Sequence, residues 1–315
     1  MSQTFCPSCS SPVSLDGERS LWFNTTLARE NWLECKKCDH LFRFPVPSPS
    51  ALHSIYSPDY YPAPHLDSKL ELLVYPQLKV RRTESGILPC VRVTNRMARV
   101  ALMRRPVYST AAPIRILEIG SADGSFSDLL RRHCPYAQVV ASEFSAVGAA
   151  RTRKTGAVSI RCSLTSLPFP DRTFDIVVLF HVLEHLTSPR RGLSEIRRVL
   201  KDAGLAIGAV PCYTSMVATI NRDSWILARD PGHLHLFSGR SLGAACSGSG
   251  LKVIWSASRQ APWNVFPARG SGSGMPRASP ERLSPRLGQA CAYPLALVAT
   301  ALDCGDELDF VATQG

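Results

Sequence analysis

Apolar runs of strand length alternate with amphipathic stretches through the middle of the chain. The clearest amphipathic stretch spans residues 192–203, where apolar positions recur with helical spacing until Gly204 ends the pattern. Strands that alternate with helices indicate a largely parallel sheet covered by helices on both faces. The runs that we interpret as buried strands are residues 114–119, 139–143, 174–180 and 206–210.

The first of these runs leads into a loop of small residues, 120–124, with Glu118 just before it. A strand that ends in an acid and glycines before a helix lets the backbone approach a ligand, as adenosyl cofactors and dinucleotides require. The G-x-A-x-G order is ambiguous by itself, because short glycine patterns arise by chance. The second run, however, ends at Glu143, about 20 residues on, where a ribose diol needs a carboxylate acceptor. Together these features predict a nucleotide pocket.

The ordered series of motifs over about residues 114–260 resembles the class I S-adenosylmethionine-dependent methyltransferases. It includes the acidic glycine loop, the second acidic strand, the sequence His-Val-Leu-Glu-His at 181–185, and the glycine-ended helix. The resemblance implies an α/β fold: a Rossmann-like sheet of seven strands with helices on both faces. It also implies S-adenosylmethionine as the cofactor.

The same resemblance assigns roles to single positions. The loop would lie under the methionine part of the cofactor, and Glu143 would accept hydrogen bonds from the ribose. Two positions depart from the family: Ala122 replaces a frequent glycine and is expected to fit if its φ stays negative, and Ser163 replaces an acid that often receives the adenine amino group, for which a hydroxyl is a weaker acceptor. The implied cofactor contacts are Glu118, Gly120, Ala122, Gly124, Glu143, Ser163, Leu164 and His181.

Four of the eleven cysteines form two C-x2-C pairs near the N-terminus, Cys6 with Cys9 and Cys35 with Cys38. Each pair can place two thiolates on one tetrahedral ion, so the two pairs predict a closed structural zinc site with no open position. Two disulfides or a redox dithiol are the alternatives. Both fit poorly with duplicated knuckles in a chain without a secretory leader pattern, for which we expect a cytoplasmic location.

We divide the chain into three parts. Residues 1–44 are expected to form a zinc ribbon, which needs its metal because so small a unit cannot build a sufficient core. Residues 45–108 are expected to contain a proline-rich linker, a tyrosine-rich segment and a helical approach with cationic faces. Residues 109–315 would form the methyltransferase domain, with a flexible insertion near 269–288 and a last strand at 306–312 that pairs antiparallel at the edge of the sheet.

The order of knuckles, proline linker and tyrosines resembles a subgroup of methyltransferases with an N-terminal zinc ribbon, which includes the sugar C-methyltransferases. In that subgroup the tyrosine segment covers the cleft, so the resemblance makes three tyrosines candidate substrate contacts. The alternative is that they pack the ribbon onto the main domain. They are Tyr56, Tyr60 and Tyr61.

Two histidine segments are candidates for the chemistry. The segment around His233 resembles the one from which the sugar C-methyltransferases present a catalytic histidine, although Gly232 stands where those enzymes have an acid. His233 is therefore predicted to be the general base, unless it only caps the following helix. His181, at the carboxyl edge of the sheet and beside the expected cofactor, is the second candidate, and His185 is expected to be mainly structural.

A formal charge of +11 would suit an acidic partner, but the excess is spread over single and paired arginines. We therefore predict methyl transfer to an oxygen or carbon of a small molecule, a metabolite, sugar or natural-product intermediate. Two alternatives stay open: an RNA base methyltransferase that uses the ribbon for RNA contacts, and a non-catalytic scaffold. No apolar run reaches the length of a membrane span, and the sequence predicts no particular oligomeric state.

Overall fold

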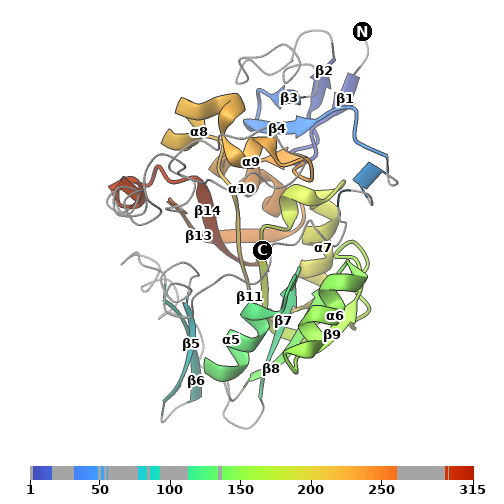
Figure 1. The fold of residues 1–315 in the computed structure, drawn as a ribbon, viewed down its shortest axis with the longest axis vertical. Helices are drawn as coiled ribbons and strands as arrows, with labels where there is room; N and C mark the ends of the chain where they lie inside the picture. The colour runs from blue at the N-terminus through green and yellow to red at the C-terminus, as the bar shows by residue number, and fades with distance from the viewer. Residues whose placement is uncertain are drawn as a thin grey trace, which may run out of the picture.

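A computed structural model describes residues 3–15, 32–48, 51–52, 55, 77–83, 86–92, 113–133, 137–260, 295–296 and 298–315. Its centre is a sheet of seven strands in the order β13-β14-β11-β10-β7-β8-β9 (Figure 1). The strands from β9 to β11 run parallel, and β14 is antiparallel to both of its neighbours. The strands are β7 (Ile114–Ile119), β8 (Ala137–Glu143), β9 (Val158–Arg161), β10 (Phe174–Phe180), β11 (Leu200–Pro211), β13 (Leu251–Arg259) and β14 (Glu307–Gln314).

Both faces of this sheet are buried. Neighbouring residues of a strand point to opposite faces, and each set packs in its own apolar cluster. In β7, Ile114 and Ile116 belong to one apolar cluster, and Leu117 and Ile119 belong to the other. Leu130 contributes to the first cluster from its helix. The second cluster includes Leu193 and Ile196 from one helix and Leu242 and Ala245 from another. The predicted α/β fold with helices on both faces is therefore confirmed.

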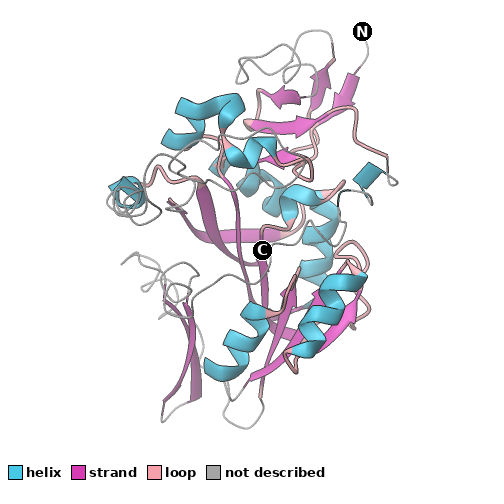
Figure 2. Cartoon of the chain, viewed as in Figure 1, coloured by secondary structure: helices cyan, strands magenta, loops and turns pink. Residues whose placement is uncertain are grey.

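The helices connect the strands or lie between the sheet and the N-terminal strands (Figure 2). In the described part of the chain, no helix combines the length and the apolar character needed to cross a bilayer. The helices are α5 (Ser125–His133), α6 (Ala146–Lys154), α7 (Pro189–Val199), α8 (Met216–Asn221), α9 (Ile226–Arg229) and α10 (Gly239–Ser247), with the 3-10 turns η1 (Leu183–His185) and η2 (Arg222–Ser224).

The last strand corrects one prediction. It is antiparallel as expected, but β14 lies between β11 and β13, and β13 forms that edge of the sheet. The burial of β14 explains its place, because residues 307–313 are all buried. A strand buried on both faces fits the interior of a sheet, where both rows of backbone hydrogen-bonding groups find partners.

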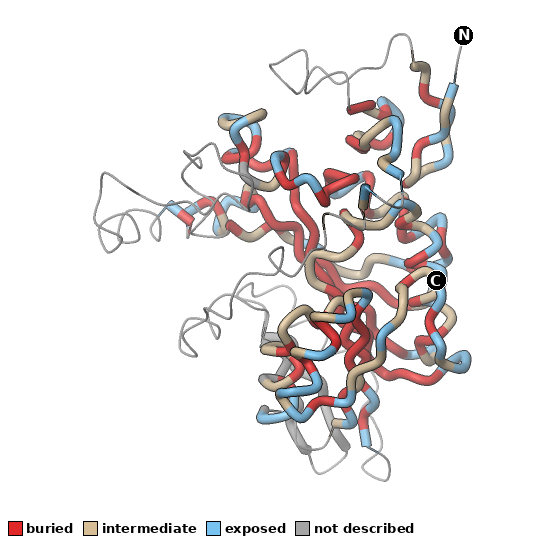
Figure 3. The backbone as a smooth tube through the Cα atoms, turned by 45° about the vertical axis from the view of Figure 1, so that its right-hand side comes forward, coloured by how far each residue is buried: buried red, intermediate tan, exposed pale blue. Residues whose placement is uncertain are grey.

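The N-terminal strands lie at one end of the molecule but are not a separate body (Figure 1). The two-residue strand β12 (His235–Leu236) pairs antiparallel with β4, which makes a three-stranded sheet in the order β12-β4-β3. Trp32 and Leu41 share an apolar cluster with Tyr213 and Trp225, and buried positions continue from the central sheet into these strands (Figure 3). The four N-terminal strands are β1 (Gln3–Phe5), β2 (Pro12–Ser14), β3 (Trp32–Cys35) and β4 (His40–Arg43).

The helical approach predicted for the later part of residues 45–108, from about residue 66, was wrong where the structure describes it. β5 (Gln77–Thr83) and β6 (Gly86–Arg92) form an antiparallel hairpin. Its connection is only two residues long, the usual length of a tight β-turn, and the β-branched Val80, Ile87 and Val91 favour strands. The predicted tyrosine contacts Tyr56, Tyr60 and Tyr61 and the predicted insertion at 269–288 lie outside the described residues.

Candidate active site

The loop after β7 requires glycine at two positions. Gly120 has a φ of +72°, and a Cβ atom there would lie 2.6 Å from Cγ2 of Val182. Gly124 has a φ of +83°, and its Cβ would lie 2.7 Å from the Cα of Thr152 in α6. The positive φ and the close contact with Val182 or Thr152 therefore explain why each position is glycine. The loop is compact and lies directly against the segment that follows β10.

Ala122 does not meet the condition set for it in the sequence analysis, a negative φ, because its φ is +48°. The backbone places this residue in the left-handed region, which costs an alanine about 1 kcal/mol or more. The turn is retained because the N–H of Ala122 donates to Oε2 of Glu143 at 2.9 Å.

We therefore expect Ala122→Gly to be neutral or to stabilise the protein by up to about 1 kcal/mol, since glycine adopts this φ without steric cost but loses more entropy on folding. Chemical denaturation measures the effect. Gly124→Ala serves as the opposite case, because its added methyl group meets backbone, and it should destabilise. A clear loss of stability in Ala122→Gly would contradict the argument from φ.

Glu118 lies at the end of β7 and is buried. The hydroxyl of Ser127 donates a hydrogen bond to Oε2 of Glu118. Burial raises the pKa of Glu118 to about 7, although the Ser127 hydrogen bond opposes the shift. The carboxyl group can therefore change its protonation state near neutral pH, and a nearby cationic ligand would favour the ionised form.

Glu143 bridges two loops at the end of β8. Its Oε1 accepts the N–H of Ser145 at 2.8 Å and its Oε2 accepts the N–H of Ala122 at 2.9 Å. Only 5% of the residue is exposed. The structure thus brings Glu143 to the glycine loop and holds the carboxylate by both oxygens.

Ser163 and Leu164 follow β9, which runs parallel to β7 and β8, so they lie at the same carboxyl edge of the sheet as the glycine loop. Oγ of Ser163 lies 2.9 Å from Oγ1 of Thr165 and accepts the Thr165 N–H at 3.2 Å. The side chain of Leu164 is buried in the main apolar cluster. Any cofactor contact of Leu164 would therefore involve its backbone rather than its side chain.

His181 follows β10 and has an unusual backbone conformation, with a φ of +54°. Nδ1 lies 3.1 Å from Oε1 of Glu184, and Nε2 lies 3.7 Å from Oε1 of Glu307. Burial disfavours its charged form, but the hydrogen bond with Glu184 and the negative charges of Glu184 and Glu307 outweigh burial and raise the pKa of His181 to about 10. About a third of the side chain, 34%, is exposed. Its neighbour Val182 packs on Gly120, so His181 lies next to the glycine loop.

Glu307 connects His181 to a second set of charges on β13 and β14. Arg259 forms ion pairs with Glu307 and with Asp309, the latter at 3.2 Å. Burial opposes ionisation of Glu307, but Arg259 and His181 outweigh it and hold its pKa at about 2. His181, Glu307, Arg259 and Asp309 therefore form one network of alternating charges where β10, β11 and β13 end.

His233 and His185 meet on the other side of Glu184. Their rings are 4.7 Å apart, edge to face. Nδ1 of His233 lies 2.6 Å from the carbonyl oxygen of Leu227, and Nδ1 of His185 lies 2.9 Å from that of Gly232. Burial, followed by the charge of His185, lowers the pKa of His233 to about 4. Because a carbonyl only accepts, both Nδ1 atoms donate their proton to it, and the lone pair of a neutral ring is then on Nε2.

The histidines and charged residues around Glu184 and Glu307 were only partly predicted. The sequence indicated His181 and His233 and gave His185 a mainly structural role. The H-x-x-E-H order at 181–185 can also suggest metal ligation, but the family motif after the strand explained it. Glu307, Arg259 and Asp309 were missed, although acids at alternate positions of a buried strand were a signal for a buried charge network. His235, the neighbour of the predicted base, instead lies in β12, with Nε2 2.8 Å from the carbonyl oxygen of Leu186.

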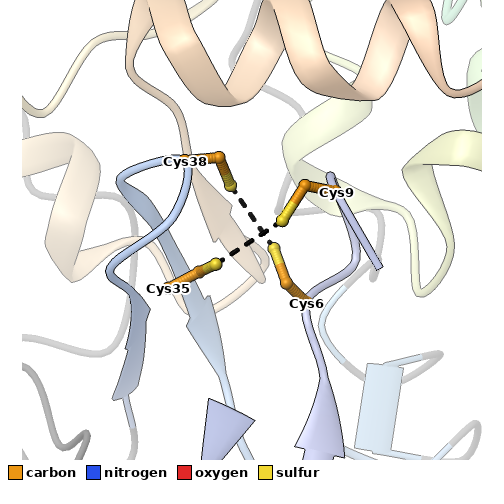
Figure 4. A group of neighbouring side chains, drawn as sticks. All are labelled: Cys6, Cys9, Cys35 and Cys38. Carbon is orange, nitrogen blue, oxygen red and sulfur yellow. Dashed lines mark hydrogen bonds between the residues drawn. The ribbon is translucent and has the colours of Figure 1, made fainter. Parts of the chain in front are cut away.

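The four predicted zinc ligands come together (Figure 4). Their sulfur atoms all lie within 4.8 Å of one another, and two pairs are 3.6 Å apart, Cys6 with Cys38 and Cys9 with Cys35. Four sulfurs at about 2.3 Å from one tetrahedral ion would be about 3.8 Å apart. The geometry of the four side chains therefore fits a zinc ion.

The electrostatics of the four cysteines also fit a cation. A hydrogen bond from Cys38 lowers the pKa of Cys6 to about 3 in spite of its burial, whereas burial raises the pKa of Cys35 to about 11. The pKa of Cys38 is also raised, chiefly by the same hydrogen bond to Cys6. A zinc ion bound between them would deprotonate all four thiols.

Comparison with known proteins gives one family and several partial relatives. The model of a family described as "Methyltransferase domain" matches residues 93–255. A Mycobacterium tuberculosis protein named "Probable S-adenosylmethionine-dependent methyltransferase" is 35% identical over 130 residues, which cover 39% of this chain and 43% of that protein. A demethylmenaquinone methyltransferase of Clavibacter sepedonicus is 35% identical over 111 residues, 33% of this chain and 44% of that protein. The chain thus spans less than half the length of these relatives.

Among solved structures, an S-adenosylmethionine-dependent methyltransferase from Thermotoga maritima is similar to this chain. The TM-score is 0.45 with 18% sequence identity, and the match covers 64% of this chain and 82% of that chain.

Proposed function

Because the chain belongs to the methyltransferase domain family, we propose that it transfers the methyl group of S-adenosylmethionine to an oxygen or carbon of a small molecule. The observation that carries this proposal is the meeting of the glycine loop with Glu143 at the carboxyl ends of β7 and β8, where open α/β sheets bind their ligands. Glu118, Gly120, Ala122 and Gly124 would hold the methionine part, and Ser163 and Leu164 would lie near the adenine.

When bound, S-adenosylmethionine supplies a methyl group on a sulfonium sulfur. In the transfer the acceptor atom forms a bond to the methyl carbon, the bond from carbon to sulfur breaks, and its electron pair stays on sulfur as a neutral thioether. The residues of the chain would hold the acceptor in line with that bond, which contributes much of the rate. A hydroxyl or carbon acid would also give up a proton, so a base is needed.

His233 is our first candidate for that base, and His181 is the second. The Leu227 carbonyl fixes the proton of His233 on Nδ1, which leaves Nε2 able to accept another. His181 lies nearer to the glycine loop, but its two carboxylate partners favour its charged form, which cannot accept a proton. Some matched relatives are named as C-methyltransferases of ubiquinone and menaquinone biosynthesis, so carbon stays among the proposed acceptor atoms.

The four cysteines would bind one structural zinc ion, which would fasten β1 and β2 to β3 and β4. The four thiolates leave the ion no open coordination position, so we assign it no part in the methyl transfer.

The cofactor assignment is tested at Glu143. We expect Glu143→Ala to weaken binding of S-adenosylhomocysteine by about tenfold to 150-fold, because the ribose would lose a charge-assisted acceptor worth about 1.5–3 kcal/mol. Titration calorimetry measures the affinity. Glu143→Gln, which keeps the shape of the side chain, should bind more tightly than the alanine variant.

The carboxylate of Glu143 also joins two loops, so thermal melting must show that each variant is folded. Equal affinity in the folded wild type and Glu143→Ala would mean that the second strand does not bind the ribose. No measurable binding to the wild type would favour the alternative of a non-catalytic scaffold.

A further inference from the structure

Next to the cofactor-binding edge lies a second cluster of metal-ligating side chains, distinct from the four cysteines. Ligand atoms of Glu184, His185 and His233 all lie within 4.8 Å of one another. Glu184 and His233 are buried, and His185 is partly exposed. Metal ions bind imidazole nitrogen and carboxylate oxygen at about 2.0–2.2 Å, so modest side-chain adjustment would bring all three onto one ion.

The two histidines are already oriented as metal ligands. The carbonyls of Gly232 and Leu227 accept the Nδ1 protons of His185 and His233, so Nε2 is the ring atom of each neutral histidine that can bind a metal ion. This arrangement, in which the far nitrogen donates to a backbone carbonyl, commonly supports metal-bound histidines. The hydrogen bond from the Leu234 N–H to the Glu184 carbonyl, at 2.7 Å, holds the two segments together.

Glu184 supplies an independent observation. Its side chain is fully buried, with 0% exposed. Oε1 is bound to His181, but Oε2 has no hydrogen-bond partner among the described residues. A buried carboxylate oxygen without a partner is costly, and it points to a group that the protein itself does not provide. Asp230 adds a second carboxylate, 3.8 Å from Nε2 of His233.

We propose that Glu184, His185 and His233 bind a first-row divalent transition-metal ion, with open coordination positions for an oxygen atom of the methyl acceptor. Two imidazoles and one carboxylate suit zinc, cobalt or iron(II) better than calcium or magnesium, which prefer oxygen ligands. Such an ion would lower the pKa of a bound hydroxyl or enol, which makes its oxygen a better nucleophile. This use of the ion rests on the proposed function, whereas its binding does not.

A metal ion and a general base would use the same lone pair of His233, so the two roles exclude each other. His185 and Glu184 separate them. If His233 is the general base, Glu184 and His185 do not need to bind a metal ion. The proposed metal site requires both of them as ligands.

The test is equilibrium dialysis of the full chain, with zinc in the four-cysteine site, against Co²⁺ and in parallel against Zn²⁺. We expect one further equivalent to bind, and the Co²⁺ spectrum should lack thiolate charge-transfer bands. Glu184→Gln and His185→Gln should each weaken this binding at least tenfold. His235→Gln is the matched control, a buried histidine that also faces a backbone carbonyl, and it should retain the ion.

The proposal is overturned if the wild type binds no further equivalent of either ion, or if Glu184→Gln and His185→Gln bind it as tightly as the wild type. S-adenosylhomocysteine binding is measured on the same samples. A protein that binds the second ion but not S-adenosylhomocysteine would retain the metal site and contradict the proposed function.

Discussion

Replacing His233 with alanine is expected to lower turnover by about 10²- to 10⁴-fold, the usual contribution of a positioned acid or base. This corresponds to about 2.7–5.5 kcal/mol of transition-state stabilisation. The residue would face the acceptor rather than the cofactor, so the affinity for S-adenosylhomocysteine should hardly change. Single-turnover methylation of the identified acceptor measures the rate, and calorimetry measures the affinity.

His235→Ala provides the comparison, because His235 is equally buried and, among the described residues, its ring makes one hydrogen bond, from Nε2 to the Leu186 carbonyl. It should have the milder effect on turnover. If His233→Ala retains nearly normal turnover, the base lies elsewhere, with His181 the next candidate. If His185→Gln loses as much turnover as His233→Ala, a shared metal ion explains both losses better than a single base.

Replacing Cys35 with serine is expected to reduce the zinc content from one equivalent to none and to unfold the N-terminal strands. Structural zinc binding contributes about 10–16 kcal/mol in small zinc-folded peptides, which have little other core. Elemental analysis and alkylation of the remaining thiols measure the two effects. Cys304→Ser is the control, since Cys304 lies outside the cluster and its Sγ donates to the Ala299 carbonyl at 3.4 Å.

The structure changes what this variant should do to the rest of the chain. From the sequence, a separate ribbon would unfold alone and leave the main domain intact. However, β4 pairs with β12, and Trp32 packs in one cluster with Trp225. We therefore expect Cys35→Ser to lower the melting temperature of the main domain as well. The zinc assignment would be refuted by a wild-type protein that is well folded without metal and in which all four thiols can be alkylated.

The central sheet could be predicted because its information is local. The apolar runs of β7 and β10 are long enough to be recognised as buried strands, and the glycine loop directly follows the first of them. The place of β14 depends on which strands flank it, which periodicity does not encode. The hairpin of β5 and β6 was missed because its arginines were interpreted as one face of a helix.

In the candidate sites too, residues that are neighbours in sequence could be predicted and residues that meet only in the fold could not. The C-x2-C spacing indicated all four cysteines, because two ligands in each pair are neighbours in sequence. The cluster of Glu184, His185 and His233 could not be recognised, since His233 reaches the other two only through the fold. Its partners on the Nδ1 side are backbone carbonyls, which carry no residue-specific signal in a sequence.

The pairing of β4 with β12 also bears on how the chain is made. Ser238 donates to the carbonyl of Cys38 across a separation of 200 residues. Contacts this distant in sequence form late, and a ribosome delivers the N-terminal strands long before their partner strand. Although β3 and β4 are synthesised long before β12, their sheet is complete only when β12 has emerged. Until then Trp32 and Leu41 lack the apolar partners of their cluster, which include Tyr213 and Trp225.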